Sequence, residues 1–208
     1  MSVSLRPLAA RFFRAPTPVI AERLLGCLLI HDSPEGRTVG RIVETEAYLA
    51  QGDGASHSAN GLTARCASMF LAPGHAYVYL IYGVHLCFNV VTGGSGVGEA
   101  VLIRALEPLE GLELMRARRG GLTGHSLTNG PGKCAQAMGL ELAHDGRGLG
   151  EGSLRLAARA RGWSPGRMVA TRRVGISKST ELPLRFLDED SSWVSRPRSV
   201  RESGSAPR

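Results

Sequence analysis

The segment Arg41-Ile-Val-Glu-Thr-Glu-Ala-Tyr48 is the one around which the rest of the chain is expected to organise. It predicts a β-strand, because apolar residues lead a run that also holds a threonine and a tyrosine. Alternate side chains of a strand share a face, so Glu44, Glu46 and Tyr48 are expected on one side. Burying two carboxylates and a ring without a purpose is costly. The alternative is a solvent-facing edge strand, since charged residues mostly lie exposed.

A carboxylate held among apolar and aromatic groups can serve as a general base. Arg104 lies in the middle of a second apolar run, and a buried arginine needs a carboxylate partner. Glu44 and Glu46 are the natural candidates for that partner.

The composition is typical of a globular protein with one domain. The chain has 208 residues, of which 43% are hydrophobic, so it can bury a sizeable core. We expect one domain over residues 1–195. Residues 196–208 are rich in Arg, Ser and Pro and are expected to form a basic, disordered tail.

The charge balance favours a polyanionic partner. The formal net charge is +7, and Lys133 and Lys178 are the only lysines among the 25 basic residues. Arginine makes forked, planar contacts with phosphate, which points to nucleic acid. A coding bias towards arginine would produce the same balance.

The cysteines and the hydropathy indicate a cytoplasmic protein without a membrane span. The cysteines are far apart and form no C-x-x-C pair, so neither a disulfide framework nor a zinc ribbon is expected. Apolar runs stay well short of the ~20 residues that a membrane helix needs. The four cysteines are Cys27, Cys66, Cys87 and Cys134.

Periodicity and turn residues predict an α+β fold with a mainly antiparallel, curved sheet, flanking helices and a protruding β-hairpin. The hairpin turns at Tyr82-Gly83. Thr17 is expected to cap the first helix. The expected helices span residues 17–25, 108–119 and 131–138, and the expected strands span residues 27–31, 38–48, 76–81, 84–91, 100–106, 167–176 and 184–187.

Two residues in turns and loops are candidates for contacts with a nucleic acid. Tyr82 would project from its glycine turn, as a wedge between stacked bases or as a cap over the core. His57 lies in an unusually long polar loop, residues 50–66, where it could be a base, a metal ligand or a stacking partner. The H-x-C pair at His85 and Cys87 is a weak metal motif without a second pair, so no metal is expected.

The segment Asn129-Gly-Pro-Gly-Lys133 resembles a phosphate loop only superficially. A P-loop needs another glycine at Leu127 and a hydroxyl residue at Cys134. A helix start with Lys133 in its first turn could still bind one DNA phosphate, or could be a plain helix start.

Taken together, these segments resemble the alkyladenine (3-methyladenine) DNA glycosylase family, the single-domain type of mammals and many bacteria. The match follows family order over about residues 8–195. The matching segments are Arg41–Leu49, His57-Ser58, Met69-Phe70, Pro73-Gly74, Tyr77–Gly83, Asn89, Leu102–Gly111, Gly130–Lys133, Arg173–Gly175, Pro183–Phe186 and Trp193–Ser195.

The resemblance implies a monofunctional enzyme of base excision repair that acts as a monomer on double-stranded DNA containing damaged purines, without metal or cofactor. The implied substrates are 3-methyladenine and 7-methylguanine, with deaminated and etheno purines as further candidates. Glu46 would activate the water that attacks the sugar C1′, and Arg104 would help to position it. The other implied roles are a base pocket of Tyr48, His57, Tyr79 and Asn89, intercalation by Tyr82, and phosphate contacts by Arg65 and Lys133.

The loop at Asn60-Gly-Leu-Thr-Ala-Arg65 departs from the family pattern by one arginine and one proline. Its phosphate contact is then weaker, or is carried by Arg65. Two other functions compete with the enzyme: a non-catalytic binder of damaged DNA or RNA with the same basic face, and a formyl-transfer-type module that binds no DNA. Glu46 separates the enzyme from the non-catalytic binder, because a pure binder would not place a carboxylate beside phosphates.

Overall fold

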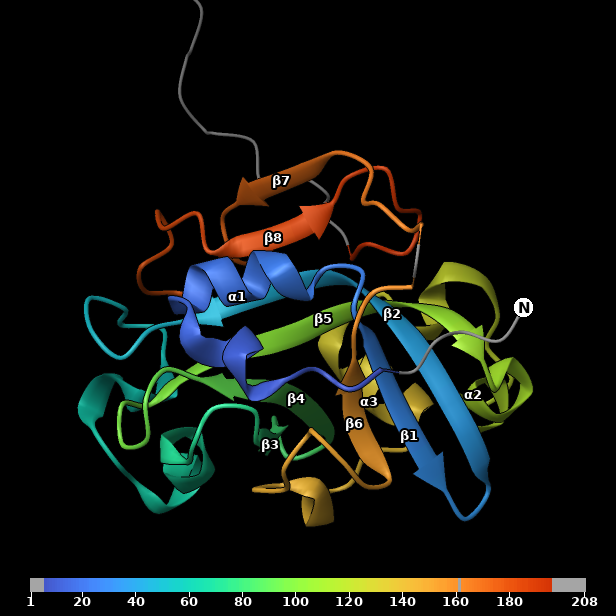
Figure 1. Ribbon diagram of the computed structural model, residues 1–208, viewed down its shortest axis with the longest axis horizontal. Coiled ribbons are helices and arrows are strands. Elements are labelled where there is room, and N and C mark those ends of the chain that lie inside the picture. The colour runs from blue at the N-terminus through green and yellow to red at the C-terminus, as the bar shows by residue number, and fades with distance from the viewer. Residues whose placement is uncertain (1–5, 161, 196–208) are drawn as a thin grey trace, which may run out of the picture.

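One antiparallel sheet organises the computed structural model, which describes residues 6–160 and 162–195 (Figure 1). Within those residues the strand order is β3-β4-β5-β2-β1-β6, and β8 pairs with both β2 and β7. The strands are β1 (Leu28–Ser33), β2 (Gly36–Tyr48), β3 (Ala76–Ile81), β4 (His85–Thr92), β5 (Glu99–Glu110), β6 (Leu154–Ala157), β7 (Met168–Thr171) and β8 (Arg185–Asp188).

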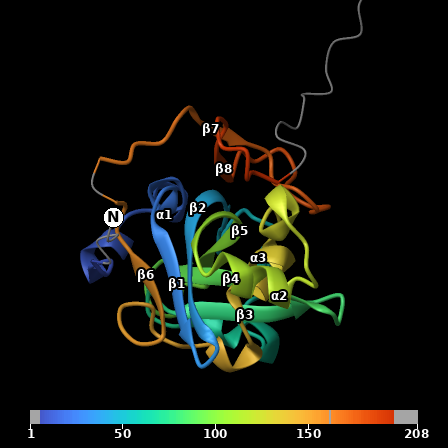
Figure 2. The same ribbon diagram turned by 90° about the vertical axis from the view of Figure 1, so that its right-hand side faces the viewer.

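Three short α-helices flank this sheet in the described part of the chain. Figure 2 shows α1 on one side of the strands and α2 with α3 on the other. Helix α1 packs on β2 and β5, and α3 packs on β4 and β5. The predicted α+β class with a curved antiparallel sheet is therefore confirmed. The helices are α1 (Thr17–Leu24), α2 (Leu112–Arg118) and α3 (Pro131–Met138), with 3₁₀ helices at Ala10–Arg14, His57–Asn60, Ala64–Phe70, Gly124–Leu127 and Leu142–His144.

Strand β2 lies inside the sheet, not at its edge. It pairs with β5 along most of its length, with β1 over its first half and with β8 near its end. Glu44 and Glu46 are both fully buried. The edge-strand alternative is therefore wrong. The register with β5 shifts on both sides of Glu44, a local irregularity at the point where the charged residues enter the core.

The β3–β4 hairpin carries the protruding tip. Figure 2 shows it extending past the rest of the sheet. Tyr82 lies at the tip with a φ of 53°, in the left-handed region that L-residues rarely adopt, and 83% of its surface is exposed. The alternative in which this ring caps the core is therefore wrong.

Several predicted boundaries are wrong. The helix expected from Pro108 begins only at Leu112, because β5 continues to Glu110. A proline is tolerated there because Pro108 pairs with Gly40 next to a register shift. The N-cap of α1 is Pro16, and the Thr17 hydroxyl instead donates to Glu99.

The C-terminal third also differs from expectation. Strand β6 was not predicted, and the strand expected over residues 167–176 ends at Thr171. The expected tail, residues 196–208, lies outside the described residues. In the described part of the chain, every helix is too short or too polar to cross a membrane.

Candidate active site

A cavity of about 520 Å³ opens beside the β3–β4 hairpin, where β4, β5 and the first turn of α3 meet the segment that follows β7. It brings together six of the predicted site residues, although these are spread over more than fifty positions in the sequence. The six are Tyr48, His57, Tyr79, Tyr82, Asn89 and Arg104.

The carboxylate of Glu46 lies directly behind the cavity wall. The Tyr48 hydroxyl donates to its Oε2 at 2.9 Å, and the Val174 backbone N–H donates to its Oε1 at 2.8 Å. Nη1 of Arg104 lies 3.2 Å from the same Oε1. Tyr48, Arg104 and Val174 all line the cavity, so the fully buried Glu46 is separated from it by the groups that bind it.

Arg104 links the two buried glutamates. Its Nε donates to Oε1 of Glu44 at 2.9 Å, while its Nη1 faces Glu46. Burial by itself lowers the pKa of Arg104, but the charges of Glu46 and Glu44 outweigh this and leave the pKa above its usual value. The predicted pairing of Arg104 with a carboxylate is confirmed, and it involves both glutamates.

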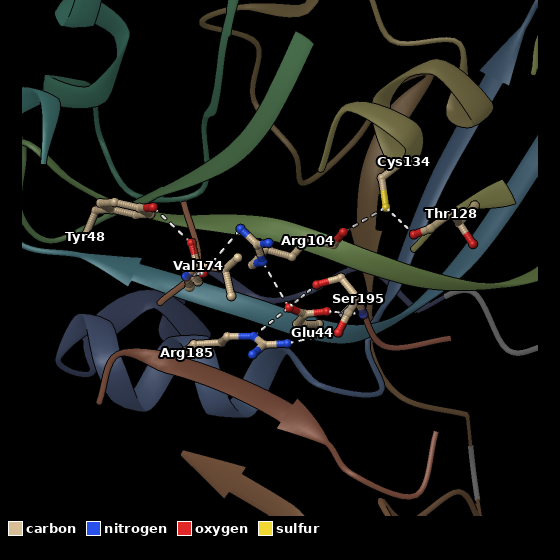
Figure 3. A network of polar contacts seen from close by, with 9 residues as sticks. Glu44, Tyr48, Arg104, Thr128, Cys134, Val174, Arg185 and Ser195 are labelled. Atoms are coloured by element: carbon tan, nitrogen blue, oxygen red, sulfur yellow. Dashed lines mark hydrogen bonds and ion pairs between the residues drawn. The ribbon is translucent and has the colours of Figure 1, made fainter. Parts of the chain in front are cut away.

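Glu44 belongs to a second, structural network (Figure 3). Nε of Arg185 on β8 donates to its Oε1 at 2.7 Å. The backbone N–H and the hydroxyl of Ser195 each donate to its carboxylate at 2.7 Å. These contacts bind the C-terminal segment to the centre of β2, behind Arg104 and away from the cavity.

A buried thiol stabilises the packing of α3 near Arg104. Sγ of Cys134 donates to the backbone carbonyl of Thr128 at 2.9 Å and approaches that of Arg104 at 3.4 Å (Figure 3). Burial raises the pKa of this thiol to about 12, so it stays protonated. Cys134 therefore has a packing role and no nucleophilic character.

Aromatic rings form the walls of the cavity. The His57 ring meets the Tyr79 ring edge-on, with centroids 4.6 Å apart, and Tyr77 and Tyr79 lie 5.2 Å apart. Burial raises the pKa of Tyr48 and of Tyr79, so both hydroxyls stay neutral. The walls therefore present uncharged π-faces.

Polar contacts fix His57 and Asn89 in this wall. Nδ1 of His57 lies 2.7 Å from the Tyr77 hydroxyl, and burial lowers the pKa of His57, helped by the nearby charge of Arg65. The imidazole is therefore neutral at neutral pH. The side-chain amide of Asn89 donates to the Tyr77 carbonyl at 3.0 Å. Tyr77 on β3 therefore holds both residues, one through its hydroxyl and the other through its backbone carbonyl.

The two predicted phosphate-binding residues lie outside the cavity lining. Arg65 is exposed, with its guanidinium 5.9 Å from the centroid of the Tyr79 ring. Lys133 is in the first turn of α3 and its Nζ donates to Oδ1 of Asn129 at 2.8 Å. Pro131 lines the cavity, so the start of α3 reaches its edge.

Sequence reasoning missed the segment from Val174 to Lys178, which lines the cavity. The strand predicted over residues 167–176 includes Val174 to Ile176, although Gly175 adopts a left-handed φ of 77°. The matching Arg173-Val-Gly175 motif was the signal that could have revealed it. In residues 6–160 and 162–195, no group of three His, Cys, Asp or Glu side chains could hold a metal ion.

The comparisons with known proteins agree with this geometry. The family model described as methylpurine-DNA glycosylase matches residues 11–192. A protein of Methanoculleus marisnigri is 52% identical over 191 residues, which cover 91% of this chain and 98% of that protein. A protein of Chlorobaculum tepidum is 44% identical over 193 residues, 92% of each chain.

A third relative, from Carboxydothermus hydrogenoformans, is 40% identical over 189 residues, 91% of this chain and 98% of that protein. All three carry the name "Putative 3-methyladenine DNA glycosylase". The family model and these relatives each cover most of the chain, and the chain therefore belongs to the methylpurine-DNA glycosylase family.

Proposed function

We propose that this DNA N-glycosylase is monofunctional and removes alkylated purines, above all 3-methyladenine and 7-methylguanine, from double-stranded DNA. Hypoxanthine and ethenoadenine are further substrates to test. The observation that carries the proposal is the buried carboxylate of Glu46 directly behind an aromatic cavity. As the family resemblance implies, the enzyme acts as a monomer in the cytoplasm, on the nucleoid, and needs neither metal nor cofactor.

The cavity suits a flipped, cationic base. The target atom of a purine is unreachable inside the duplex, so the nucleotide must leave the stack. Alkylation at N3 or N7 gives the purine a positive charge. The neutral faces of Tyr48, Tyr79 and His57 attract such a ring, with up to about 2 kcal/mol for each desolvated cation–π contact. Asn89, held by Tyr77, is proposed to discriminate against the exocyclic amine of normal guanine.

Glu46 is proposed to accept the proton of the attacking water. The water oxygen forms a bond to C1′ as the N-glycosidic bond breaks, and the purine leaves with the bonding electrons. Arg104 lines the cavity and contacts Glu46, so it can orient this water. The carboxylate also stabilises the oxocarbenium-like transition state, as in glycoside hydrolysis.

The hairpin tip is proposed to fill the gap that the flipped nucleotide leaves. Tyr82 is exposed and lines the edge of the cavity. Arg65 and Lys133 are proposed to bind backbone phosphates, in keeping with the net charge of +7.

A single-turnover base-release assay tests this function. Duplexes carry hypoxanthine, ethenoadenine or random methylated purines, and the wild type is compared with Glu46→Gln. We expect release by the wild type alone, with damage-specific binding retained in the variant. Glu107→Gln is the matched control, because Glu107 lies on β5 in an ion pair with Arg41. Binding without release by the wild type would instead favour a non-catalytic binder, and equal release by Glu46→Gln would exclude Glu46 as the base.

A further inference from the structure

A fully buried ion pair joins two segments that line the cavity. Nη1 and Nη2 of Arg173 each donate to one carboxylate oxygen of Asp53, both at 2.6 Å. Both side chains are completely buried. Asp53 belongs to the long loop after β2, and Arg173 lies 120 positions later, beyond β7.

Arg173 also contacts the residues around Glu46. Its guanidinium carbon lies 4.6 Å from the centroid of the Tyr48 ring, and its Nη1 donates to the Ala47 carbonyl at 3.0 Å. Burial by itself lowers the pKa of Arg173, but the hydrogen bonds and the charge of Asp53 outweigh this and leave the pKa above its usual value. Arg173 is therefore a permanent charge that fixes the ring of Tyr48.

The residue after Arg173 completes the coordination of the carboxylate. The Val174 N–H donates to Oε1 of Glu46, and the Tyr48 hydroxyl donates to Oε2. Arg173 therefore positions both donors to Glu46. It holds the Val174 amide through the peptide backbone and the Tyr48 hydroxyl through its contact with the Tyr48 ring. A displacement of Arg173 would move both donors together.

Asp53, the partner of Arg173, holds the loop after β2 in place on the other side of the cavity. It accepts the backbone N–H of Leu49 and that of Ala55, each at 3.1 Å. Gly54 and Ala55 line the cavity, and the Gly54 N–H also donates to the Ser179 hydroxyl at 2.9 Å. The ion pair thus connects both sides of the cavity.

We propose that Arg173 is a positioning residue for the base-release step and that Asp53 is its obligatory partner. The inference rests on the proposed function of Glu46. Since the ion pair is buried and lies behind Tyr48, it acts on the chemical step and not on DNA affinity. A displacement of about 1 Å at a reacting group can cost on the order of 100-fold in rate.

The test uses the full chain with Arg173→Met, Asp53→Asn and the double variant. Single-turnover release of methylated purines from randomly methylated DNA, with enzyme in excess, gives the rate. Affinity is measured for a duplex with a tetrahydrofuran abasic analogue. We expect each single variant to lose about 100-fold in rate, with affinity within about twofold of the wild type. The double variant should lose no more than either single variant, because the pair acts as a unit.

Arg155→Met is the matched control. Arg155 also forms a 2.6 Å ion pair, with Asp32, but on β6 at the other end of the sheet. Arg173→Lys keeps the positive charge but loses the bidentate contact with Asp53, so it replaces Arg173→Met if that variant does not fold. Thermal melts show which variants are folded at the assay temperature. Wild-type rates in the single variants, or a parallel loss of rate and affinity in folded variants, would overturn the positioning role and leave the proposed function intact. No release by the wild type would overturn both.

Discussion

Glu44 and Glu46 bind the same guanidinium, that of Arg104, from two positions on β2. Their other partners differ. Arg185 and Ser195 bind Glu44, whereas the Tyr48 hydroxyl and the Val174 amide bind Glu46. One glutamate therefore connects Arg104 to the scaffold and the other connects it to the cavity. The two carboxylates share an arginine but should have separable effects on stability and on activity.

Glu44→Gln should destabilise the protein strongly. The change removes a fully buried charge and breaks its ion pairs with the buried Arg185 and Arg104, and such losses cost about 3–5 kcal/mol. Glu46→Gln should cost less, because Arg104 keeps its bond to Glu44. Urea unfolding of the two variants measures the free energies. Equal losses would contradict the division of roles.

The sequence predicted the central strand and the protruding hairpin because β-branched and aromatic residues lie there between strong turn residues. It could not predict the continuation of β5 through Pro108, which depends on a register shift against Gly40 in a distant strand. It also failed at Thr17, where contacts with Thr92 and Glu99 replace the expected cap. In both cases, tertiary contacts with residues distant in the sequence override the local conformational preference.

For the site, the sequence predicted individual residues better than the contacts between them. The pairing of Arg104 with a buried glutamate followed from the cost of burying a charge. The ion pair of Arg173 with Asp53 did not, because nothing local relates positions 120 apart. The strand predicted over residues 167–176 likewise runs past Thr171 into the segment that lines the cavity, where Gly175 has a left-handed φ of 77°. The assigned roles in catalysis and in DNA binding stay predictions.

Tyr82→Gly should separate stability from function at the hairpin tip. Tyr82 is exposed and has a left-handed φ of 53°, which glycine adopts freely, so the change should stabilise the fold by up to about 1 kcal/mol. It should also lower affinity for a lesion duplex, because the proposed wedge is lost. Thermal melts and fluorescence titration test the two effects.

Val84→Ala is the control for Tyr82, since Val84 is also exposed, at 72%, beside the same turn. It should change lesion affinity less than Tyr82→Gly does. Lesion affinity and release rate unchanged by Tyr82→Gly would refute intercalation by Tyr82.

Arg65→Ala tests whether Arg65 replaces the arginine missing from its loop. Loss of one phosphate contact should reduce the slope of log Kd against log salt by about 0.9. Arg167→Ala is the matched control, because Arg167 is exposed but paired with Glu189 and lies outside the cavity lining. A slope equal to that of the wild type would assign the phosphate contact elsewhere, with Lys133 as the next candidate.

His57 should make the protein sensitive to acid. Its pKa is lowered in the folded state, so folding favours the neutral imidazole, and this contribution is complete above the unfolded pKa of about 6.5. It is lost as the pH falls below that value, because the unfolded chain then binds the proton more readily. His57→Phe should therefore show a smaller fall in Tm between pH 7 and pH 5 than the wild type.

The same protonation should affect substrates differently. A charged His57 in the cavity wall repels a cationic purine but not a neutral one, so release of methylated purines should fall more steeply than release of hypoxanthine as the pH drops from 7 to 5. His75→Phe is the control, because His75 is not among the residues that line the cavity. Parallel pH profiles for the two substrates in the wild type would show that His57 does not contact the flipped base in its charged form.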